Sequence, residues 1–243
     1  MTPKTDQIYA AASGRPADFR FDSKVAQVFA DMIARSVPGY GLTLDMIGVI
    51  AKHYVTDGSQ CYDLGCSLGA STLAIRHNIV AKDTHIIGID NSSAMIDQCR
   101  QNIADNPELP TVELRAEDLL DSQFGNASLV TMNFTLQFIA AEQRPSLLKR
   151  IADGMNEGGA MILSEKIALT GSMEQEVMTD LHHGFKAAMG YSEMEIAQKR
   201  QAIENVLIPD TVDTHKERLH DAGFSHVYLW FQCFNFVSLL AIK

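Results

Sequence analysis

The sequence predicts an α/β fold in which a seven-stranded, mostly parallel sheet carries an antiparallel terminal strand and helices on both faces. First, short apolar segments of strand length alternate with helical patterns between residues 60 and 164. Second, three helical patterns in succession then interrupt this alternation. Third, the segments 227–231 and 234–242 are joined by a connection that is too short for a parallel crossover. Together these features indicate a layered domain with an insertion and a terminal hairpin.

Length and composition fit one globular domain. The chain has 243 residues, of which 46% are hydrophobic and 21% charged, so it can bury a sizeable core. Thirty acidic residues against 20 basic ones give a net charge of −10. This charge disfavours direct binding of RNA or DNA, which depends on basic patches.

The N-terminus and the apolar segments bear on domain boundaries and location. Residues 1–20 are polar and rich in proline and glycine, which predicts a flexible arm rather than a secretory signal. No apolar segment reaches the ~20 residues that span a bilayer. We therefore expect a cytoplasmic protein with one domain over 21–243, in which a helical insertion occupies about 172–207.

Two helices are predicted before the sheet. Apolar residues from Val25 to Ile33 recur at helical spacing, and this helix should end before Pro38. A second helix is expected over 43–54, with its apolar residues on one side. These are the N-terminal helices of the predicted fold.

Five strand and helix units should follow. The strands are expected at 60–64, 85–89, 112–114, 128–133 and 159–164. Ser92 or Ser93 can cap the helix after the second strand. The helix after the fourth strand should begin near Glu142, with Pro145 in its first turn, and end at Gly154. This order predicts parallel strands with crossover helices.

Three more helices are predicted after Glu165. The first has an apolar stripe formed by Val177, Met178, Leu181, Phe185, Ala188 and Met189. Segments 192–195 and 214–217 have the capping-box pattern, and the last helix should end at Gly223. The insertion is long enough to form a lid or a dimer contact.

A glycine turn at 62–70, with the sequence YDLGCSLGA, indicates a nucleoside site. Gly65 permits a tight turn and close approach of a ligand, and Gly69 lets the following helix pack near the sheet. A dinucleotide fingerprint has glycine where this chain has Ser67. The turn therefore favours a nucleoside without a pyrophosphate, such as S-adenosylmethionine.

Polar residues at other strand ends strengthen this interpretation. Asp90 ends the second strand, where an acid commonly accepts the hydroxyls of an adenosine ribose. Asp118 follows the third strand and is a candidate for the adenine amino group, and Asn133 ends the fourth. Because the carboxyl ends of parallel strands share one edge of the sheet, we expect one crevice. The alternative is that the turn and Asp63 only shape the backbone.

Other reactive side chains have weaker claims. The cysteines form no CxxC pair and are expected to be reduced thiols: Cys61, Cys66, Cys99 and Cys233. Cys66 has no histidine near it in the chain, so backbone contact with a ligand is favoured over a nucleophilic role. His182 and His183 are adjacent on a helix, about 100° apart, and should not share a metal ion. No metal is expected.

Five further segments carry a resemblance to a known family. They are 36–40 (SVPGY), 89–92 (IDNS), 133–138 (NFTLQF), 190–193 (GYSE) and 229–236 (LWFQCFNF). With the glycine turn, they make the sequence resemble the carboxy-S-adenosyl-L-methionine synthase family over about 21–243. The resemblance implies the Rossmann-like fold of class I methyltransferases, whose sheet typically carries an antiparallel terminal strand.

The resemblance also implies an activity. Family members convert S-adenosyl-L-methionine and prephenate to carboxy-S-adenosyl-L-methionine and phenylpyruvate, without a metal, and are homodimers. A separate enzyme uses the product to modify the wobble uridine of tRNA. The ligand residues implied by position are Tyr40, Gly65, Cys66, Ser67, Asp90, Asn91, Asp118, Leu119, Asn133 and Arg200. Tyr40 and Arg200 are the implied catalytic residues.

Arg200 distinguishes the implied activity from methyl transfer. A planar guanidinium can hold a carboxylate by two hydrogen bonds, whereas a methyl group offers it nothing. The sequence leaves open whether Arg200 acts in its own subunit or in the partner. The implied chemistry needs an enclosed pocket and positioning more than an acid and base pair. The alternatives are a conventional methyltransferase, including one that acts on tRNA, and a non-catalytic sensor of S-adenosylmethionine.

Overall fold

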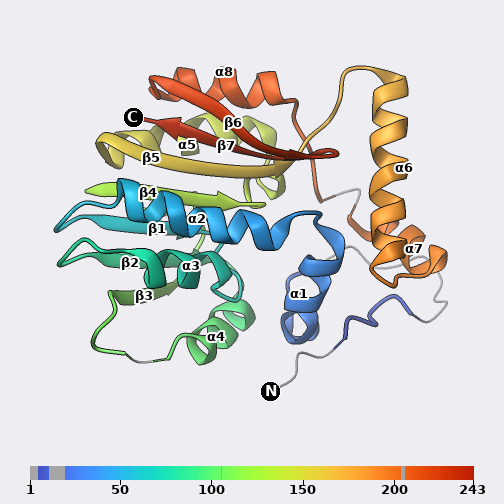
Figure 1. The fold of residues 1–243 in the computed structure, drawn as a ribbon, viewed down its shortest axis with the longest axis horizontal. Helices are drawn as coiled ribbons and strands as arrows, with labels where there is room; N and C mark the ends of the chain where they lie inside the picture. The colour runs from blue at the N-terminus through green and yellow to red at the C-terminus, as the bar shows by residue number, and fades with distance from the viewer. Residues whose placement is uncertain (1–4, 11–19, 105, 204–205) are drawn as a thin grey trace.

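The computed structural model describes residues 5–10, 20–104, 106–203 and 206–243. Its strands are β1 (Gln60–Leu64), β2 (His85–Asp90), β3 (Thr111–Ala116), β4 (Ala127–Asn133), β5 (Met155–Lys166), β6 (His226–Cys233) and β7 (Phe236–Ile242). They form one sheet in the order β3-β2-β1-β4-β5-β7-β6 (Figure 1). The first five strands are parallel, and β7 pairs antiparallel with both β5 and β6. The predicted fold class is confirmed.

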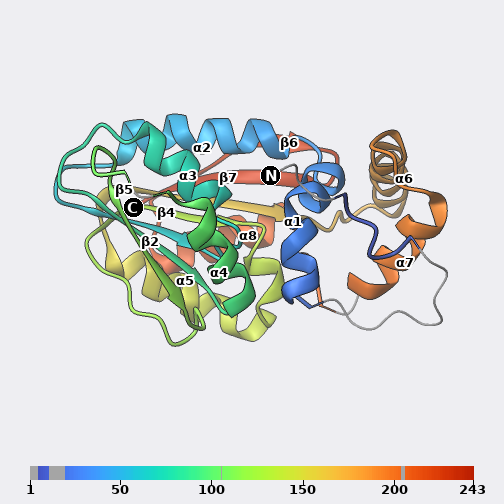
Figure 2. The same ribbon diagram turned by 90° about the horizontal axis from the view of Figure 1, so that it is seen from below.

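Helices cover both faces of the sheet and also lie beyond the carboxyl ends of its parallel strands. They are α1 (Ser23–Ser36), α2 (Tyr40–Tyr54), α3 (Ala70–Asn78), α4 (Ser93–Asn102), α5 (Arg144–Gly154), α6 (Ser172–Ala188), α7 (Glu193–Ile203) and α8 (Val212–Ala222), with 3-10 turns η1 (Leu136–Phe138) and η2 (Ala141–Gln143). Helices α2 and α3 lie on one face and α5 and α8 on the other (Figure 2). Helices α6 and α7 stand beyond the carboxyl ends of the parallel strands (Figures 1 and 2).

The two-residue period of the strands divides the core. Cys61 and Leu129 belong to the buried cluster that contacts α2 and α3. Their neighbours Tyr62 and Val130 belong to the cluster that contacts α5 and α8. Successive side chains point to opposite faces of a strand, so a sheet buried on both faces reads as a continuous apolar run.

Most predicted helices are confirmed, with two corrections at the connections. Helix α2 begins at Tyr40 rather than at residue 43, because Gly39 takes a left-handed conformation (φ 77°) and turns the chain directly into the helix. Helix α8 is capped by Thr211, whose hydroxyl accepts from the N–H of Thr214 at 3.1 Å, and not by the predicted box at 214–217. The box at 192–195 does form, because Glu195 and Ser192 bond reciprocally.

The prediction of five strand and helix units is wrong at one place. After β3 the chain makes a turn near Leu119 and returns to the sheet at β4 without a helix between them. The side chain of Asp118 accepts from the N–H of Leu120 at 2.9 Å, and this short Asx-type bond stabilises the turn. The connection therefore leaves Asp118 at the carboxyl edge of the sheet.

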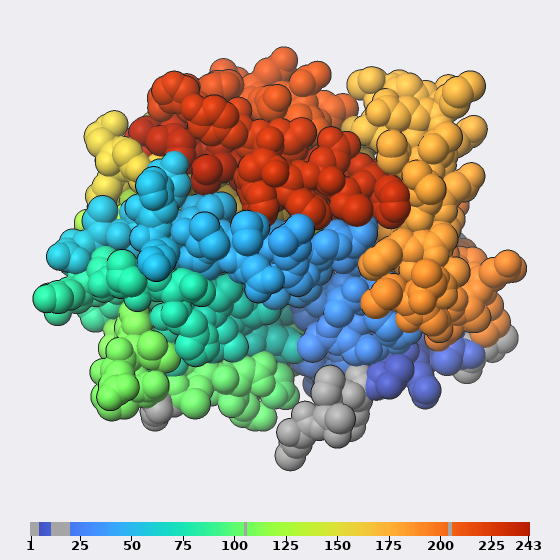
Figure 3. Space-filling model, in the orientation of Figure 1, coloured from blue at the N-terminus to red at the C-terminus, as the bar shows by residue number. Residues whose placement is uncertain are grey.

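Much of the predicted apolar stripe of α6 faces solvent, although Met178 and Phe185 are half-buried. Val177, Leu181 and Met189 are 48%, 45% and 39% exposed, whereas His182 and Lys186 are buried. Periodicity identifies an apolar face of a helix but not what covers that face. Helix α6 lies at the outer end of the molecule (Figure 3), with its polar face turned inward.

One further observation concerns membranes. Among the helices in the described part of the chain, none is both long enough and apolar enough to cross a bilayer.

Candidate functional site

A cavity of about 520 Å³ lies at the carboxyl ends of the parallel strands. Nine of the ten predicted ligand residues line it: Tyr40, Gly65, Cys66, Ser67, Asp90, Asn91, Asp118, Leu119 and Asn133. They come from the ends of β1, β2, β3 and β4 and from the start of α2. The carboxyl edge of a parallel sheet is the usual ligand site of such folds. The sequence thus identified residues that the fold brings together.

The glycine turn forms the floor of this cavity. The N–H groups of Gly65 and Cys66 both donate to the carbonyl of Ile89, at 2.8 and 3.0 Å, which ties the turn to β2. Gly65 has φ 77°, and a Cβ there would lie 2.2 Å from Oγ1 of Thr135. Only glycine fits this position, because a side chain there would collide with Thr135 and because residues with a side chain rarely adopt this positive φ. Because Gly65 has no side chain, a ligand in the cavity can lie directly against the backbone of the turn.

Asp90 is held in a fixed orientation. One carboxylate oxygen accepts from the N–H of Ser67 and the other from the N–H of Ser92, both at 2.9 Å. Burial raises the pKa of Asp90, and these two bonds oppose that shift. Each oxygen keeps a second acceptor position. The carboxylate is therefore oriented to accept two hydroxyls from a ligand.

Asn133 offers an unused acceptor. Its Nδ2 donates to Oγ of Ser71 at 3.2 Å, whereas its Oδ1 is buried and has no hydrogen-bond partner. A buried, unpaired amide oxygen is costly unless something bonds to it. A ligand with an N–H or O–H group in the cavity would satisfy it. The cavity thus fits S-adenosylmethionine, whose ammonium and hydroxyls are donors.

Asp63 supports the site from beneath. It is buried and accepts from the hydroxyls of Thr72 and Thr131, at 2.6 and 3.0 Å. Burial raises the pKa of Asp63 to about 6. Asp63 therefore has a structural role, because it links β1 to the first turn of α3 and to β4.

The thiol of Cys66 is unsuited to nucleophilic chemistry. It is buried beside Cys99 and Ile96. Hydrogen bonding to Cys99, followed by burial, raises the pKa of Cys66, so the thiol stays protonated. This agrees with the expectation that Cys66 contributes its backbone.

Tyr40 adds an aromatic wall. Its ring lies 6.4 Å from that of Phe134, centroid to centroid, and both residues line the cavity. Burial, with a smaller effect of Asp63, raises the pKa of Tyr40. Its hydroxyl is therefore a hydrogen-bond donor at neutral pH.

Arg200 lies elsewhere. It is exposed on α7 and lines a separate, open hollow with His183 and Gln201. It is nevertheless near the cavity, because it adds to burial in lowering the pKa of Lys166, which lines the cavity wall. Within this single chain the structure does not bring Arg200 together with the other nine predicted residues.

Sequence reasoning missed the basic residues of the cavity. Lys166, Lys186 and Lys199 line it, as does His182. The imidazole of His182 bonds to the carbonyl of Ser36 at 2.8 Å, and burial lowers the pKa of His182 to about 3, so it is neutral. His182 and Lys186 are four residues apart and share one face of α6. That spacing is a signal that could have revealed an inward polar face.

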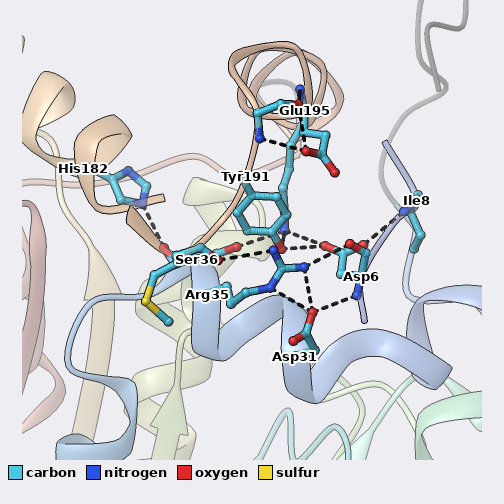
Figure 4. A network of polar contacts seen from close by, with 11 residues as sticks. Asp6, Ile8, Asp31, Arg35, Ser36, His182, Tyr191 and Glu195 are labelled. Atoms are coloured by element: carbon cyan, nitrogen blue, oxygen red, sulfur yellow. Dashed lines mark hydrogen bonds and ion pairs between the residues drawn. The ribbon is translucent and has the colours of Figure 1, made fainter. Parts of the chain in front are cut away.

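An N-terminal segment contacts Lys199, one of the basic residues that line the cavity. Residues 1–4 and 11–19 of the predicted flexible arm lie outside the described residues, but Asp6 is described and is 2% exposed. Its carboxylate accepts from the hydroxyl of Tyr191 at 2.7 Å and from Nζ of Lys199 at 3.2 Å. Its backbone carbonyl accepts from Arg35 at 2.9 Å (Figure 4). Asp6 therefore anchors this part of the N-terminal segment, and its carboxylate supplies the counter-charge of Lys199.

We expect Asp6→Asn to lower the free energy of unfolding by about 1–3 kcal/mol, the cost of weakening a charged, buried hydrogen-bond partner. Denaturant titration measures the change. Asp121→Asn, at an exposed aspartate, is the matched control and should be neutral. Equal stability of the Asp6 and Asp121 variants would contradict an anchoring role for Asp6.

Comparison with known proteins identifies the family of the chain. Residues 62–159 match the family described as "Methyltransferase domain". The chain is 55% identical to a carboxy-S-adenosyl-L-methionine synthase of Hahella chejuensis, with 100% of both chains covered. It is 56% identical to that of Marinobacter nauticus, covering 98% of this chain and 95% of the relative.

Solved structures show the fold alone. A putative S-adenosyl-L-methionine-dependent methyltransferase of Methanococcus maripaludis matches with a TM-score of 0.61 and 17% identity, covering 95% of this chain and 97% of that one. Such methyltransferase neighbours support the class I methyltransferase fold. The full-length identity to curated relatives goes further: the chain belongs to the carboxy-S-adenosyl-L-methionine synthase family, a family of transferases that act on S-adenosyl-L-methionine.

Proposed function

We propose that this enzyme converts S-adenosyl-L-methionine and prephenate to carboxy-S-adenosyl-L-methionine and phenylpyruvate. The observation that carries the proposal is the full-length identity of 55% to a carboxy-S-adenosyl-L-methionine synthase. The cavity at the strand ends supports it, because nine residues expected at the ligand line that cavity.

The nine cavity residues are proposed to hold the adenosyl part of the substrate. Asp90 accepts the ribose hydroxyls, with Asn91 beside it, and Asp118 and Leu119 contact the adenine. Oδ1 of Asn133, which has no protein partner, accepts a hydrogen bond from the substrate. The backbone of Gly65, Cys66 and Ser67 forms the surface on which the nucleoside lies.

The proposed reaction balances without a metal or redox partner. Prephenate loses carbon dioxide and its ring hydroxide, and the ring becomes aromatic. The hydroxide takes a proton from the methyl group on sulfur, giving water, and that carbon forms a bond to the carbon dioxide. Such a sequence requires a site that holds the reactants together and excludes water, which we propose the cavity does when both substrates are bound. The protonated hydroxyl of Tyr40 is suited to donate to the new carboxylate.

Mass spectrometry of a reaction with both substrates tests this function. Appearance of phenylpyruvate and of a ligand heavier than S-adenosyl-L-methionine by one carboxyl group supports the synthase. Unchanged prephenate would return the protein to the alternatives, a conventional methyltransferase or a binding protein.

A homodimer is proposed to complete the site. Met173, Val177 and Leu181 form an exposed apolar row on α6, at a spacing of four residues. A second copy of the chain is the proposed partner of this row. Arg200, in the neighbouring hollow, is then available to hold the product carboxylate from the partner subunit.

We expect Arg200→Ala to weaken binding of the carboxylated product by about 2–4 kcal/mol, with a much smaller effect on S-adenosyl-L-methionine. Isothermal titration with each ligand measures both. Equal losses for the two ligands would contradict the assigned role.

Subunit mixing tests which chain supplies Arg200. If it acts across the dimer, mixed dimers of Arg200→Ala with Asp90→Ala retain one intact site. About a quarter of wild-type activity should return on mixing, since half of the dimers are mixed and each has one good site of two. No recovery would contradict action across the dimer.

The downstream role is proposed from family membership. The product would supply the carboxymethyl donor for modification of the tRNA wobble uridine by a separate enzyme, in the cytoplasm. The net charge of −10 supports a division of labour in which this chain does not itself bind tRNA.

A further inference from the structure

Two lysines of the cavity have no acidic partner. Lys166 ends β5 and Lys186 lies on α6, and both line the cavity. Among the described residues, no carboxylate forms an ion pair with either ammonium group. Glu165, next to Lys166 in the chain, instead accepts from the N–H groups of Leu136 and Gln137, both at 2.9 Å. The acid adjacent in sequence is therefore already engaged.

The third lysine of the cavity differs from these two. Lys199 is paired with Asp6 at 3.2 Å and also donates to Ser36 at 2.9 Å. Its charge is thus compensated by the protein. Lys166 and Lys186 are therefore the two cavity lysines whose charge is available to pair with an anionic ligand.

The surroundings of Lys186 intensify its need for an anion. The charged groups that lower its pKa, after burial itself, are Lys199, Lys166 and Arg200, all cations. Burial and these neighbours lower the pKa of Lys186 to about 7. A buried ammonium among like charges is unfavourable until an anion joins it. An anionic ligand would relieve both costs.

The strand order separates the charges along the cavity. From β3 to β5, the strand ends supply Asp118, Asp90, the glycine turn, Asn133 and then Lys166. The acidic side suits the hydroxyls and amino group of a nucleoside. The basic side, completed by Lys186 from α6, suits carboxylates. The cavity therefore has one side for each of two chemically different ligands.

We propose that Lys166 and Lys186 form the subsite that binds the carboxylates of prephenate. The inference rests on the proposed function, since prephenate is a dianion that must lie beside the adenosyl substrate. The methionine carboxylate of S-adenosyl-L-methionine is the other source of the same chemistry. Two uncompensated cations match a dianion better than they match a substrate that carries its own ammonium and sulfonium.

The test replaces each lysine and measures both substrates separately. Lys166→Gln and Lys186→Gln should each raise the KM for prephenate at least about tenfold, the scale of a lost charged hydrogen bond, and change the Kd for S-adenosyl-L-methionine less than about twofold. Lys186→Arg, which keeps the charge, should recover part of the affinity. Lys52→Gln removes an exposed lysine and is the matched control for net charge.

Proton uptake provides a readout that a structural role would not move. Above pH 7 the free Lys186 is increasingly neutral, so binding an anion should draw a proton to it. Isothermal titration of the protein with prephenate at pH 8, in two buffers of different ionisation enthalpy, should show proton uptake in the wild type. The Lys186→Gln variant should take up fewer protons. The other titratable groups that face this region, Lys166, Lys199, Arg200, His182 and His183, are common to both proteins.

The possible outcomes distinguish failure of the proposed subsite from failure of the proposed function. Equal weakening of both substrates, or an unchanged KM for prephenate in folded variants, would overturn the subsite while the synthase activity stands. If the wild type forms no phenylpyruvate, the function fails, and terephthalate, a ring dianion, becomes the calorimetric probe. Its lysine-dependent binding would then support the subsite, and failure to bind would overturn it as well.

Discussion

Arg144→Ala is expected to lower the free energy of unfolding by about 3–5 kcal/mol, the range found when one partner of a buried ion pair is removed. The side chain is fully buried and pairs with Asp210 at 2.6 Å. It also donates to the carbonyls of Ile139 and Ile208, at 2.8 and 2.9 Å. Its loss would remove the donor to the carbonyls of Ile139 and Ile208 and leave Asp210 with Arg218 as its remaining ion-pair partner.

Arg144 also shapes the cavity. The segment it holds includes Gln137 and Ile139, which line the cavity beside η1. Thermal and denaturant unfolding at neutral pH measure the loss. Arg100→Ala, at an exposed arginine paired with Asp97, should cost less than about 1 kcal/mol. A loss as small for Arg144 would contradict its role in joining these segments.

The pH dependence of this ion pair has a defined sign. Burial alone would raise the pKa of Asp210, but Arg144 and Arg218 outweigh it, and the pKa lies below the usual 3.8. A carboxyl whose pKa is lower in the folded chain stabilises it fully above the unfolded value. That contribution disappears as the pH falls through the folded value. The difference between wild type and Arg144→Ala should therefore narrow in acid.

Asp90→Ala is expected to weaken S-adenosyl-L-methionine binding by about 100-fold or more. Each hydrogen bond to a charged group contributes about 1.5–3 kcal/mol, and the ribose supplies two hydroxyls. The carboxylate is already oriented by the N–H groups of Ser67 and Ser92. The proposed site therefore loses a preorganised acceptor pair.

Isothermal titration measures this loss, and thermal unfolding verifies that the variant is folded. Asp97→Ala, at an exposed aspartate on α4, is the control and should bind normally. A folded Asp90→Ala protein with near wild-type affinity would refute Asp90 as the ribose acceptor. The prephenate subsite would not be affected by that result, because it lies at the other side of the cavity.

The strand ends were the most predictable part of the molecule. Gly65, Asp90 and Asn133 could be assigned to one edge because a parallel sheet aligns its carboxyl ends, whatever the details of the helices. Residue spacing within each unit is set by local geometry. The fold, the glycine turn and the polar strand ends follow from such local patterns, whereas the family resemblance alone assigned three further residues to the site: Tyr40, Asn91 and Leu119.

Helix α6 was least predictable. Its apolar stripe could be identified from residue spacing, but its packing could not: Val177 and Leu181 are exposed while His182 and Lys186 are buried. Periodicity reports that a helix has two unlike faces, but the packing partners decide which is buried. For the same reason Asp6 could not be matched with Lys199, which lies 193 residues away.

The sequence by itself determined the order of the strands and of most helices, the glycine turn and the acidic strand ends, because these depend on contacts close in the chain. Only the tertiary structure decided which charged groups lack partners. Lys166 and Lys186 are ordinary lysines in the sequence, and they become a candidate anion site because folding places them in one cavity where, among the described residues, no carboxylate pairs with either. Burial and charge compensation are properties of the assembled chain.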